Sequence, residues 1–472
     1  MSTTATSAER LADTGRALRL ARELGRRETW PPERLAAHRQ ARLDALVRHA
    51  AAHSPYYRAR LAGLPAHGPV RLADLPVLDK PAMMAHFDEL VTDPRLRCDA
   101  LLEHLDGLTH DALYLREYRA MTTSGSSGQK GLYIYDRAAW RVIIAQFFRF
   151  NAIAAIRPRL PRLRIASVGG GAPTHMSRRG AESVAIGLHR VLGLAVTMPL
   201  ERIVAALNAF RPDYLTAFPS MAALLAAEQQ AGRLHIAPAT ISTMSELRTP
   251  EVTARIEEAF GVRPFDLYAT TEGLWGCDCP HHAGVHLFDD LTLVENVGDD
   301  GRPVPPGEPG ARLLITNLFN LVQPLIRFEV SDVVTLDPEP CPCGRTLPRV
   351  RSLEGRADDV LHLPAAAGGR VAVLPLQFGV VTADRGVREF QVVQRGDRLR
   401  LRVALADDAP VAHTTGRLCD RVTARLRELG VADPRVDVET VAALERPPSG
   451  KLQIVVADRR AAPEPPRAPA PV

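Results

Sequence analysis

The spacing of apolar positions divides the chain into stretches of different character. Residues 16–63 are rich in Ala, Leu and Arg at helical spacing, which predicts helices interrupted at 53–55. From residue 120 onward, short apolar runs alternate with longer amphipathic stretches, a pattern typical of α/β layers with a largely parallel sheet. The predicted strands are 112–119, 163–168 and 212–217, and the predicted helices are 138–150, 221–231 and 250–260.

In the second half of the chain the pattern of apolar and polar positions changes twice. Residues 284–335 carry short β-like segments with Gly/Pro turns, which predicts a β-rich subdomain. After residues 355–359 (GRADD) an α+β pattern begins, with strands expected at 387–393 and 398–404 and a helix at 414–429. We therefore expect an α/β fold: a large N-terminal domain (1–355) of layered α/β subdomains plus the β-rich subdomain, and a small mobile α+β C-terminal domain (356–460). Residues 1–9 look loose, and the Pro/Ala-rich 461–472 predict a disordered tail.

Composition and charge narrow the class of protein. The 472 residues are 46% hydrophobic and 24% charged, which suits a soluble protein with a sizeable core. No apolar run reaches the roughly 18 residues of a membrane span, and the N-terminus lacks a signal-peptide pattern, so we expect a cytoplasmic protein without a membrane partner. The net charge of +5 is spread along the chain without a basic stripe interleaved with aromatics, so no nucleic-acid partner is expected.

The choice of basic residues is uneven, because only three of the 59 are lysines: Lys80, Lys130 and Lys451. A site that needs a compact point charge cannot accept the broad, planar guanidinium of arginine. Lys130 and Lys451 lie beside glycines, and we expect both to be functional, with Lys80 the weaker candidate. The alternative is that codon bias replaced most lysines by arginine and that the three remaining lysines have no special role.

Four stretches carry chemistry that suits a nucleotide. Residues 122–131 (TTSGSSGQKG) combine glycines, hydroxyls and a lysine, as in a phosphate-holding loop, although Walker spacing is absent. Residues 268–273 (YATTEG) place a carboxylate beside hydroxyls, where it can hold a metal ion that bridges phosphates. In 326–332 (IRFEVSD), Asp332 can accept from a ribose diol and Arg327 can neutralise phosphate. In 446–451 (RPPSGK), Lys451 is expected to approach the other three when the small domain closes. Taken singly, each stretch also fits a linker, turn or surface loop.

In this order the four stretches and the GRADD segment resemble the adenylate-forming superfamily of acyl-CoA synthetases and adenylation domains. More narrowly they resemble its phenylacetate–CoA ligase branch, through 53–57 (HSPYY), 75–80 (LPVLDK) and 212–220 (PDYLTAFPS). The resemblance spans about residues 50–455. It implies two steps: a carboxylic acid attacks the α-phosphorus of Mg-ATP to give an acyl-adenylate and pyrophosphate, and then a thiol such as CoA displaces AMP after the small domain rotates.

The resemblance also implies residue roles. Lys451 bridges carboxylate and α-phosphate, Thr271 contacts the α-phosphate, and Glu272 holds Mg²⁺. The remaining nucleotide-binding positions are Ser124, Gly125, Ser126, Ser127, Gly128 and Lys130 for the β- and γ-phosphates, Tyr268 on the adenine side, Asp332 at the ribose, and Arg327. Asp358 is the expected hinge. The acid, aryl or small acyl, is expected to contact Gly170, Phe218, Ser245 and Trp275.

The acceptor and the assembly stay open at this point. Residues 363–370 (LPAAAGGR) depart from the family's usual segment after the hinge, which helps to shape the thiolation conformation. CoA is the leading acceptor, and an amine, a carrier-protein thiol or an inorganic nucleophile is the alternative. A third hypothesis is a nucleotide-binding partner protein that has lost catalysis, although retention of Lys451 speaks against it. A homodimer is expected by analogy with the family.

Four of the six cysteines form two Cys-x-Cys pairs, at 277/279 and 341/343, and the first pair precedes His281, His282 and His286. Thiolate and imidazole suit a closed, four-coordinate structural Zn²⁺. Some phenylacetate–CoA ligase relatives carry a similar set, which implies Cys279, His286, Cys341 and Cys343 as the ligands, with Cys277 or His281 as substitutes. The alternative is a set of ordinary reduced cysteines.

Overall fold

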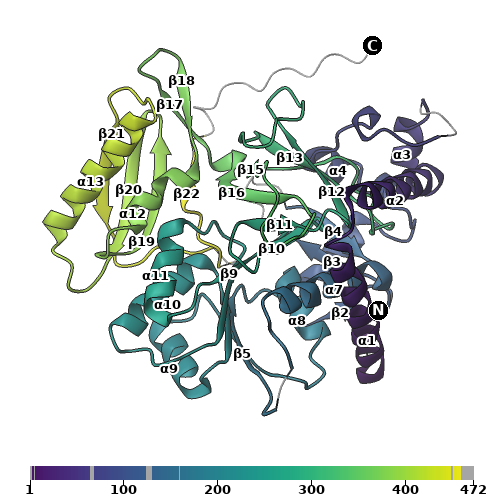
Figure 1. The fold of residues 1–472 in the computed structure, drawn as a ribbon, viewed down its shortest axis with the longest axis horizontal. Coiled ribbons are helices and arrows are strands. Elements are labelled where there is room, and N and C mark those ends of the chain that lie inside the picture. Colours follow the sequence, from purple (N-terminus) through teal and green to yellow (C-terminus); the bar gives the residue numbers. More distant parts are fainter. Residues whose placement is uncertain are drawn as a thin grey trace.

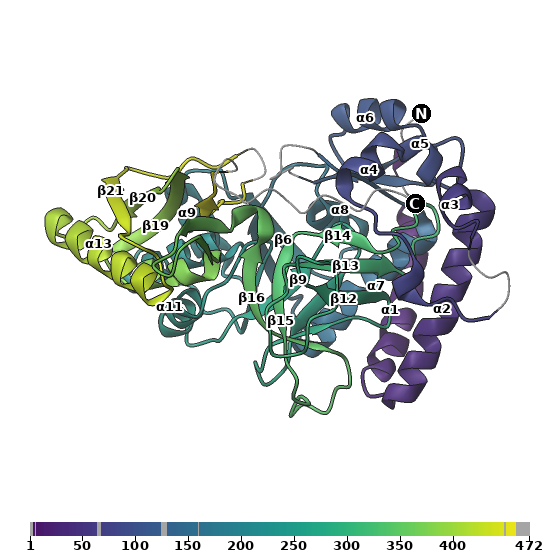
Figure 2. The same ribbon diagram turned by 90° about the horizontal axis from the view of Figure 1, so that it is seen from above.

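The computed structural model describes residues 3–4, 6–63, 68–123, 130–158, 160–447 and 450–458. The N-terminal helices lie at one end and the C-terminal elements at the other, with a large sheet between them (Figure 1, Figure 2). The expected α/β class is confirmed. The tail expected at 461–472 lies outside the described residues. In the described ranges, no helix combines the length and the apolar character needed to cross a bilayer.

Three helices cover the N-terminal stretch that was predicted to be helical: α1 (Ser7–Arg27), α2 (Pro32–His53) and α3 (Pro55–Arg60). The break at 53–55 is confirmed, because the Ser54 side chain caps α3 and Pro55 occupies its first position, where no intrahelical N–H is lost. Helix α1 begins inside the nine residues predicted to be loose. A capping box between Thr6 and Glu9 starts this helix, and the Thr-x-x-Glu signal stands in the sequence.

A nine-stranded mixed sheet forms the centre, in the order β15-β16-β11-β10-β9-β8-β7-β5-β6. Neighbours from β6 to β9 pair in parallel, as predicted, and the other pairings are antiparallel. The parallel strands are joined by helices on the sheet faces, which parallel pairing requires. The strands are β5 (Arg164–Gly169), β6 (Arg190–Ala195), β7 (Tyr214–Ala217), β8 (Thr240–Met244), β9 (Phe265–Ala269), β10 (Trp275–Asp278), β11 (Val285–Leu287), β15 (Asp332–Leu336) and β16 (Arg349–Arg356).

Three helices of this sheet agree with the predicted amphipathic stretches at 138–150, 221–231 and 250–260, within a few residues at their ends: α7 (Arg137–Ile153), α10 (Pro219–Gln230) and α11 (Pro250–Phe260). Two further helices, α8 (Met176–Ser183) and α9 (Leu200–Phe210), were not predicted. Shorter helices α4 (Lys80–Ala85), α5 (Phe87–Leu90) and α6 (Cys98–Asp106) follow α3.

The single strand predicted over 112–119 is wrong. Leu115 and Arg116 take positive φ angles of 49° and 60°, and this turn divides the stretch into β2 (Ala112–Leu113) and β3 (Arg119–Thr122). Strand β2 pairs with β1 (Thr3–Thr4), and β3 pairs with β4 (Leu132–Tyr135). The β-like texture of 284–335 is confirmed by an antiparallel three-stranded sheet of β12 (Thr292–Val297), β13 (Arg312–Asn317) and β14 (Phe328–Val330).

The elements after β16 have a hydrophobic core of their own, which includes Leu361, Phe390, Leu418 and Val455. A four-stranded sheet in the order β21-β20-β19-β22 forms this unit with α13, close to the predicted strands and helix. Its last strand, β22, returns the chain after Lys451 to pair in parallel with β19. The elements are β17 (Leu361–Pro364), β18 (Arg370–Val373), α12 (Gly379–Thr382), β19 (Val387–Arg395), β20 (Arg398–Leu405), α13 (Val411–Glu428), β21 (Arg435–Thr440) and β22 (Val455–Val456).

Candidate active site

The carboxyl ends of β5, β7, β8 and β9 open on a cavity of about 1920 Å³. Ligands of α/β sheets bind at this edge, because the loops after the strands converge there. The cavity is also lined by Arg356 at the end of β16, by Asp358, and by the stretch 451–455 of the C-terminal unit. The cavity is larger than the roughly 300–1,000 Å³ of most small-molecule pockets, so it has room for two substrates.

Most residues predicted for the site line this one cavity, although they come from distant parts of the sequence. They are Gly170, Phe218, Ser245, Tyr268, Thr271, Glu272, Trp275, Asp332, Asp358 and Lys451. Ser124, Gly125, Ser126, Ser127 and Gly128 lie outside the described residues. Thr122 and Thr123, which precede them directly, also line the cavity.

The turn that carries Thr271 and Glu272 is held from outside the motif. The Tyr135 hydroxyl donates to the Thr271 carbonyl oxygen at 2.7 Å, and the Asn317 side-chain amide donates to the Glu272 carbonyl oxygen at 2.9 Å. Gly273 has a φ of 101°, and a Cβ there would lie 2.2 Å from the Asn317 amide nitrogen, so only glycine fits. The turn therefore presents a fixed, largely buried Glu272 carboxylate beside the Thr271 hydroxyl, an oxygen donor set that suits Mg²⁺.

Asp332 is held beside the same turn. The Tyr268 hydroxyl donates to its carboxylate at 2.5 Å, and the Arg356 Nε atom lies 3.5 Å from its other oxygen. Burial, followed by the charge of Asp332, raises the pKa of Tyr268 well above the ordinary value, so this hydroxyl stays a donor. The pair fixes the carboxylate at the cavity wall.

The structure corrects the role expected for Arg327. Two nitrogens of its guanidinium contact the Glu295 carboxylate, each at 3.0 Å, and a third donates to the Leu75 carbonyl oxygen at 2.9 Å. These contacts hold Arg327 inside the protein, and it is not among the described residues that line the cavity. The arginine beside Asp332 is Arg356, which also lines the cavity. The sequence analysis did not name Arg356 as a site residue, although it stands in the GRADD segment.

The lysines are also placed differently from expectation. Lys451 lines the cavity, as expected, but so does Lys80, the candidate ranked lowest. Lys80 begins α4, whose N-terminus is capped by the Asp79 side chain. Lys130 is exposed and, within the described part of the chain, is not part of the lining. The sequence signal that could have identified Lys80 as a site residue is the LPVLDK segment, one of the stretches that resemble the phenylacetate–CoA ligase branch.

Lys451 is a half-buried cation among charged groups. Burial, and next the positive charge of Arg356, lower the pKa of Lys451 below that of an ordinary lysine, while Glu246, Glu272 and Asp332 oppose the shift. His175, also on the cavity wall, has its pKa lowered by burial and by Lys451. The charge of Lys451 therefore interacts with the carboxylates of both sequence motifs, Glu272 and Asp332.

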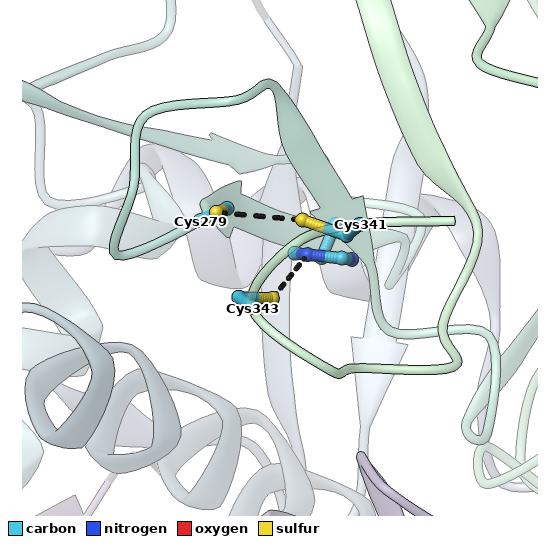
Figure 3. A group of neighbouring side chains, drawn as sticks. Cys279, Cys341 and Cys343 are labelled. Atoms are coloured by element: carbon cyan, nitrogen blue, oxygen red, sulfur yellow. Dashed lines mark hydrogen bonds between the residues drawn. The ribbon is translucent and has the colours of Figure 1, made fainter. Parts of the chain in front are cut away.

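A second group of side chains forms a metal-binding geometry away from the cavity. One ligand atom from each of Cys279, His286, Cys341 and Cys343 lies within 4.8 Å of the others. The thiols of Cys279 and Cys341 are 3.5 Å apart, and the His286 Nε2 atom is 3.2 Å from the Cys343 sulfur (Figure 3). The cluster joins the β10–β11 turn to the 341–345 turn.

The surroundings prepare these four side chains for a metal. The His286 Nδ1 atom donates to the Leu347 carbonyl oxygen at 3.2 Å, so Nε2 turns its lone pair toward the cysteines. Burial lowers the pKa of His286 to about 4, which keeps the imidazole neutral. Of the described candidates, Cys277 packs into the hydrophobic core, and exposed His281 approaches Cys279 only through its backbone N–H.

Known proteins with a similar sequence or fold include CoA ligases. No protein-family model matches the sequence. The chain is 28% identical over 385 residues to a phenylacetate–coenzyme A ligase of Thermus thermophilus, which covers 78% of this chain and 80% of that protein. It is 24% identical over 356 residues to a phenylacetate–coenzyme A ligase of Pseudomonas putida, covering 71% of this chain and 73% of the relative. A 2-hydroxyisobutyryl-CoA ligase structure superposes with a TM-score of 0.73 at 23% identity over 92% of each chain.

The fold is that of the adenylate-forming CoA ligases. Within this class the chain is similar in sequence to phenylacetate–CoA ligases over more than two thirds of its length. The resemblance inferred from the motifs is confirmed.

This chain superposes on that 2-hydroxyisobutyryl-CoA ligase with a TM-score of 0.73 for the structure in the postadenylation state and 0.58 for the structure in the thioesterification state.

Proposed function

We propose that this chain is an AMP-forming ligase that activates a carboxylic acid with ATP as an acyl-adenylate and then transfers the acyl group to CoA. Pyrophosphate leaves in the first step and AMP in the second. The observation that carries this proposal is the meeting of Lys451, Glu272, Thr271 and Asp332 around one cavity. The names of the similar CoA ligases support it.

Each group of wall residues has a role in ATP binding. Asp332 accepts from the ribose hydroxyls, with Tyr268 and Arg356 fixing its carboxylate. The segment that begins at Thr122 and Thr123 holds the β- and γ-phosphates, and Lys80 adds a positive charge to the same cavity. Glu272 would hold Mg²⁺, which supplies positive charge to the phosphate oxygens when bound.

Lys451 is the proposed catalytic residue. As the acid oxygen attacks the α-phosphorus, negative charge grows on the phosphoryl oxygens, and a fixed ammonium stabilises this charge more in the transition state than in the ground state. Thr271 lines the same cavity, and its proposed role is to contact the α-phosphate. Because Lys451 belongs to the C-terminal unit, withdrawing that unit removes the charge and opens the adenylate to the second substrate.

The acid side of the cavity favours an aryl or small acyl acid. Its wall includes the apolar side chains of Ile143, Phe147 and Phe218, while glycines at 169–171 leave room. Trp275 is 6% exposed, and its indole N–H has no hydrogen-bond partner among the described residues. A buried donor without a partner is costly, so we expect the acid to carry an acceptor that reaches Trp275.

Two architectural features complete the proposal. A structural Zn²⁺ is held by Cys279, His286, Cys341 and Cys343, since two turns that bring together three thiols and a neutral imidazole form a closed ligand set. The chain bends at Asp358, between β16 and β17, where the large domain (1–355) meets the small domain (356–460). Asp358 is exposed and lines the cavity, as a pivot between the two units requires.

The test is ATP–pyrophosphate exchange with a panel of aryl and short acyl acids, with and without acceptor substituents. We expect exchange with at least one acid and a loss of about 10³-fold in Lys451→Ala, as for removal of a transition-state charge. If no acid supports pyrophosphate exchange while ATP still binds, the proposed ligase activity is contradicted. AMP release that depends on an amine, a carrier protein or an inorganic nucleophile, and not on CoA, would favour the alternative acceptor.

A further inference from the structure

A buried carboxylate ties the segment that carries Lys451 to the large domain. Glu246 follows β8, and its Oε1 atom accepts from the backbone N–H of Leu452 at 2.7 Å. Its Oε2 atom accepts from the backbone N–H of Ser220 at 3.1 Å, in the first turn of α10, where this donor has no intrahelical partner. The Glu246 side chain is 2% exposed. One carboxylate therefore bridges a helix of the large domain and the residue that follows Lys451.

Arg446 reaches the same carboxylate from the small domain. Its Nη1 atom lies 3.7 Å from the Glu246 Oε1 atom and donates to the Ser220 hydroxyl at 3.1 Å. The same nitrogen donates to the Gly450 carbonyl oxygen at 3.1 Å, and Nη2 is paired with Glu389 of β19. Arg446 is thus oriented by its own domain and directed at the other one.

The Lys451 segment is also seated sterically. Gly450 has a φ of 76°, and a Cβ there would lie 2.1 Å from the Val196 Cγ1 atom and 3.7 Å from the Phe218 ring. A side chain at this position would collide with the large domain. The backbone beside Lys451 therefore lies directly against the cavity wall.

We propose that Glu246 and Arg446 are positioning residues, which form a latch that holds Lys451 in the adenylation arrangement and releases it for the second step. This inference rests on the proposed function. Rotation of the small domain separates Glu246 from Leu452 and Arg446, while the Arg446 contacts to Glu389 and Gly450 travel with that domain. Glu246 keeps the α10 amide, so neither charge is left without a partner when the latch opens.

The latch differs from the other contacts across the same interface. Arg255 of α11 donates to the carbonyl oxygens of Thr382 and Val387, and Arg385 pairs with Glu258. The Arg385 and Glu258 side chains are 85% and 52% exposed, so this ion pair contributes little. Arg385→Gln is therefore a matched control: it removes an arginine that bridges the same two domains, but away from Lys451.

The test compares Glu246→Gln, Arg446→Gln and the double variant in each half-reaction. Pyrophosphate exchange measures the first, and transfer from a preformed acyl-adenylate to CoA measures the second. We expect exchange to fall about 10- to 100-fold in each single variant, as for loss of a buried charge-assisted contact, with transfer within about twofold of wild type. The double variant should fall no further than the worse single variant, because the two residues act as one unit.

A readout independent of activity comes from hydrogen exchange of the peptide 450–458 without substrates. In both single variants, the backbone amides of residues 450–458 should exchange their hydrogens with solvent at least about tenfold faster than in wild type. In Arg385→Gln their rate of hydrogen exchange should not change in this way. Unchanged protection in both variants overturns the latch, as do parallel losses in the two half-reactions or multiplicative losses in the double variant. Faster exchange in the variants of a protein that activates no acid would support the latch while contradicting the proposed function.

Discussion

At the scale of single residues, the few lysines are informative because arginine serves wherever a generic positive charge is enough. Two of the three lysines, Lys80 and Lys451, line the cavity, and they come from distant parts of the sequence. An ammonium on a flexible stem can follow phosphate oxygens whose positions change during a reaction, whereas a planar guanidinium is suited to a fixed partner. Arginines such as Arg327 and Arg446 accordingly make fixed contacts to carboxylates and carbonyl oxygens.

Lys80→Ala and Lys130→Ala test this placement directly. We expect Lys80→Ala to raise the KM for ATP about tenfold, because it removes a positive charge from the cavity, and Lys130→Ala to change it less than about threefold. The KM for ATP in the exchange assay is the measurement. The reverse order would return the phosphate-binding role to Lys130, as the sequence indicated.

The alkaline limb of the pH–rate profile tests the surroundings of Lys451. Its pKa is lowered in the protein, so the active ammonium is lost at a lower pH than for an ordinary lysine. Arg356→Gln removes the neighbouring positive charge that favours deprotonation, so the pKa of Lys451 should rise and the limb should move to higher pH. Exchange measured at saturating ATP separates this shift from weaker ATP binding, and a limb that stays in place or moves to lower pH contradicts the assignment.

At the scale of elements, two turns far apart in sequence depend on one another. The 341–345 turn contains Arg345, which pairs with Glu28 at the end of α1, and the neighbouring Thr346 N–H donates to the Glu28 carbonyl oxygen at 2.8 Å. Glu28 also holds the buried Arg149 of α7. A metal at the cysteine cluster would therefore stabilise the region where α1, α7 and the β10–β11 turn meet.

Metal content tests the cluster. We expect about one Zn²⁺ per chain in the wild type and in Cys419→Ser, whose thiol lies outside the cluster, and much less in Cys341→Ser. The Tm of Cys341→Ser should fall, since metal binding to the native state adds to the free energy of unfolding. Elemental analysis and thermal unfolding measure the two effects, and equal zinc content in all three proteins would rule out these ligands.

At the scale of the whole molecule, the proposed reaction would need two arrangements of the C-terminal unit relative to the rest of the chain. The described arrangement closes Lys451 over the cavity, and α11 contacts α12 and β19 across the interface. Gly379 lies where a Cβ would approach the Glu251 carboxyl carbon to 3.0 Å. This close approach offers a point at which the two domains can be joined covalently.

A crosslink at that point tests the rotation. Glu251→Cys with Gly379→Cys, oxidised or joined by a short thiol crosslinker, should keep pyrophosphate exchange and lose CoA transfer at least about tenfold, because the small domain cannot leave the cavity. Reduction of the disulfide should restore transfer. Wild type and the single variants receive the same treatment as controls, and full transfer by the locked enzyme would contradict a required rotation.

The sequence by itself determined the local chemistry of this protein. Strands β5 and β7 and helices α7, α10, α11 and α13 followed from periodicity, whereas β6, β8 and β9 were not predicted. Thr271, Glu272, Asp332 and Lys451 were predicted because their motifs are short and depend on neighbours in sequence. The four cysteine and histidine positions were likewise indicated by spacing and resemblance, and the structure brings them together. The Thr-x-x-Glu signal of the capping box that begins α1 also stands in the sequence.

Only the tertiary structure decided which charged side chains reach the cavity. Arg327 is drawn away by Glu295 and the Leu75 carbonyl oxygen, while Arg356 takes the place beside Asp332. The hydrogen bond from Leu452 to Glu246 joins residues whose positions differ by 206 in the sequence. The partner of a long charged side chain is whichever group packing brings within a few ångströms, and spacing along the sequence does not encode that distance.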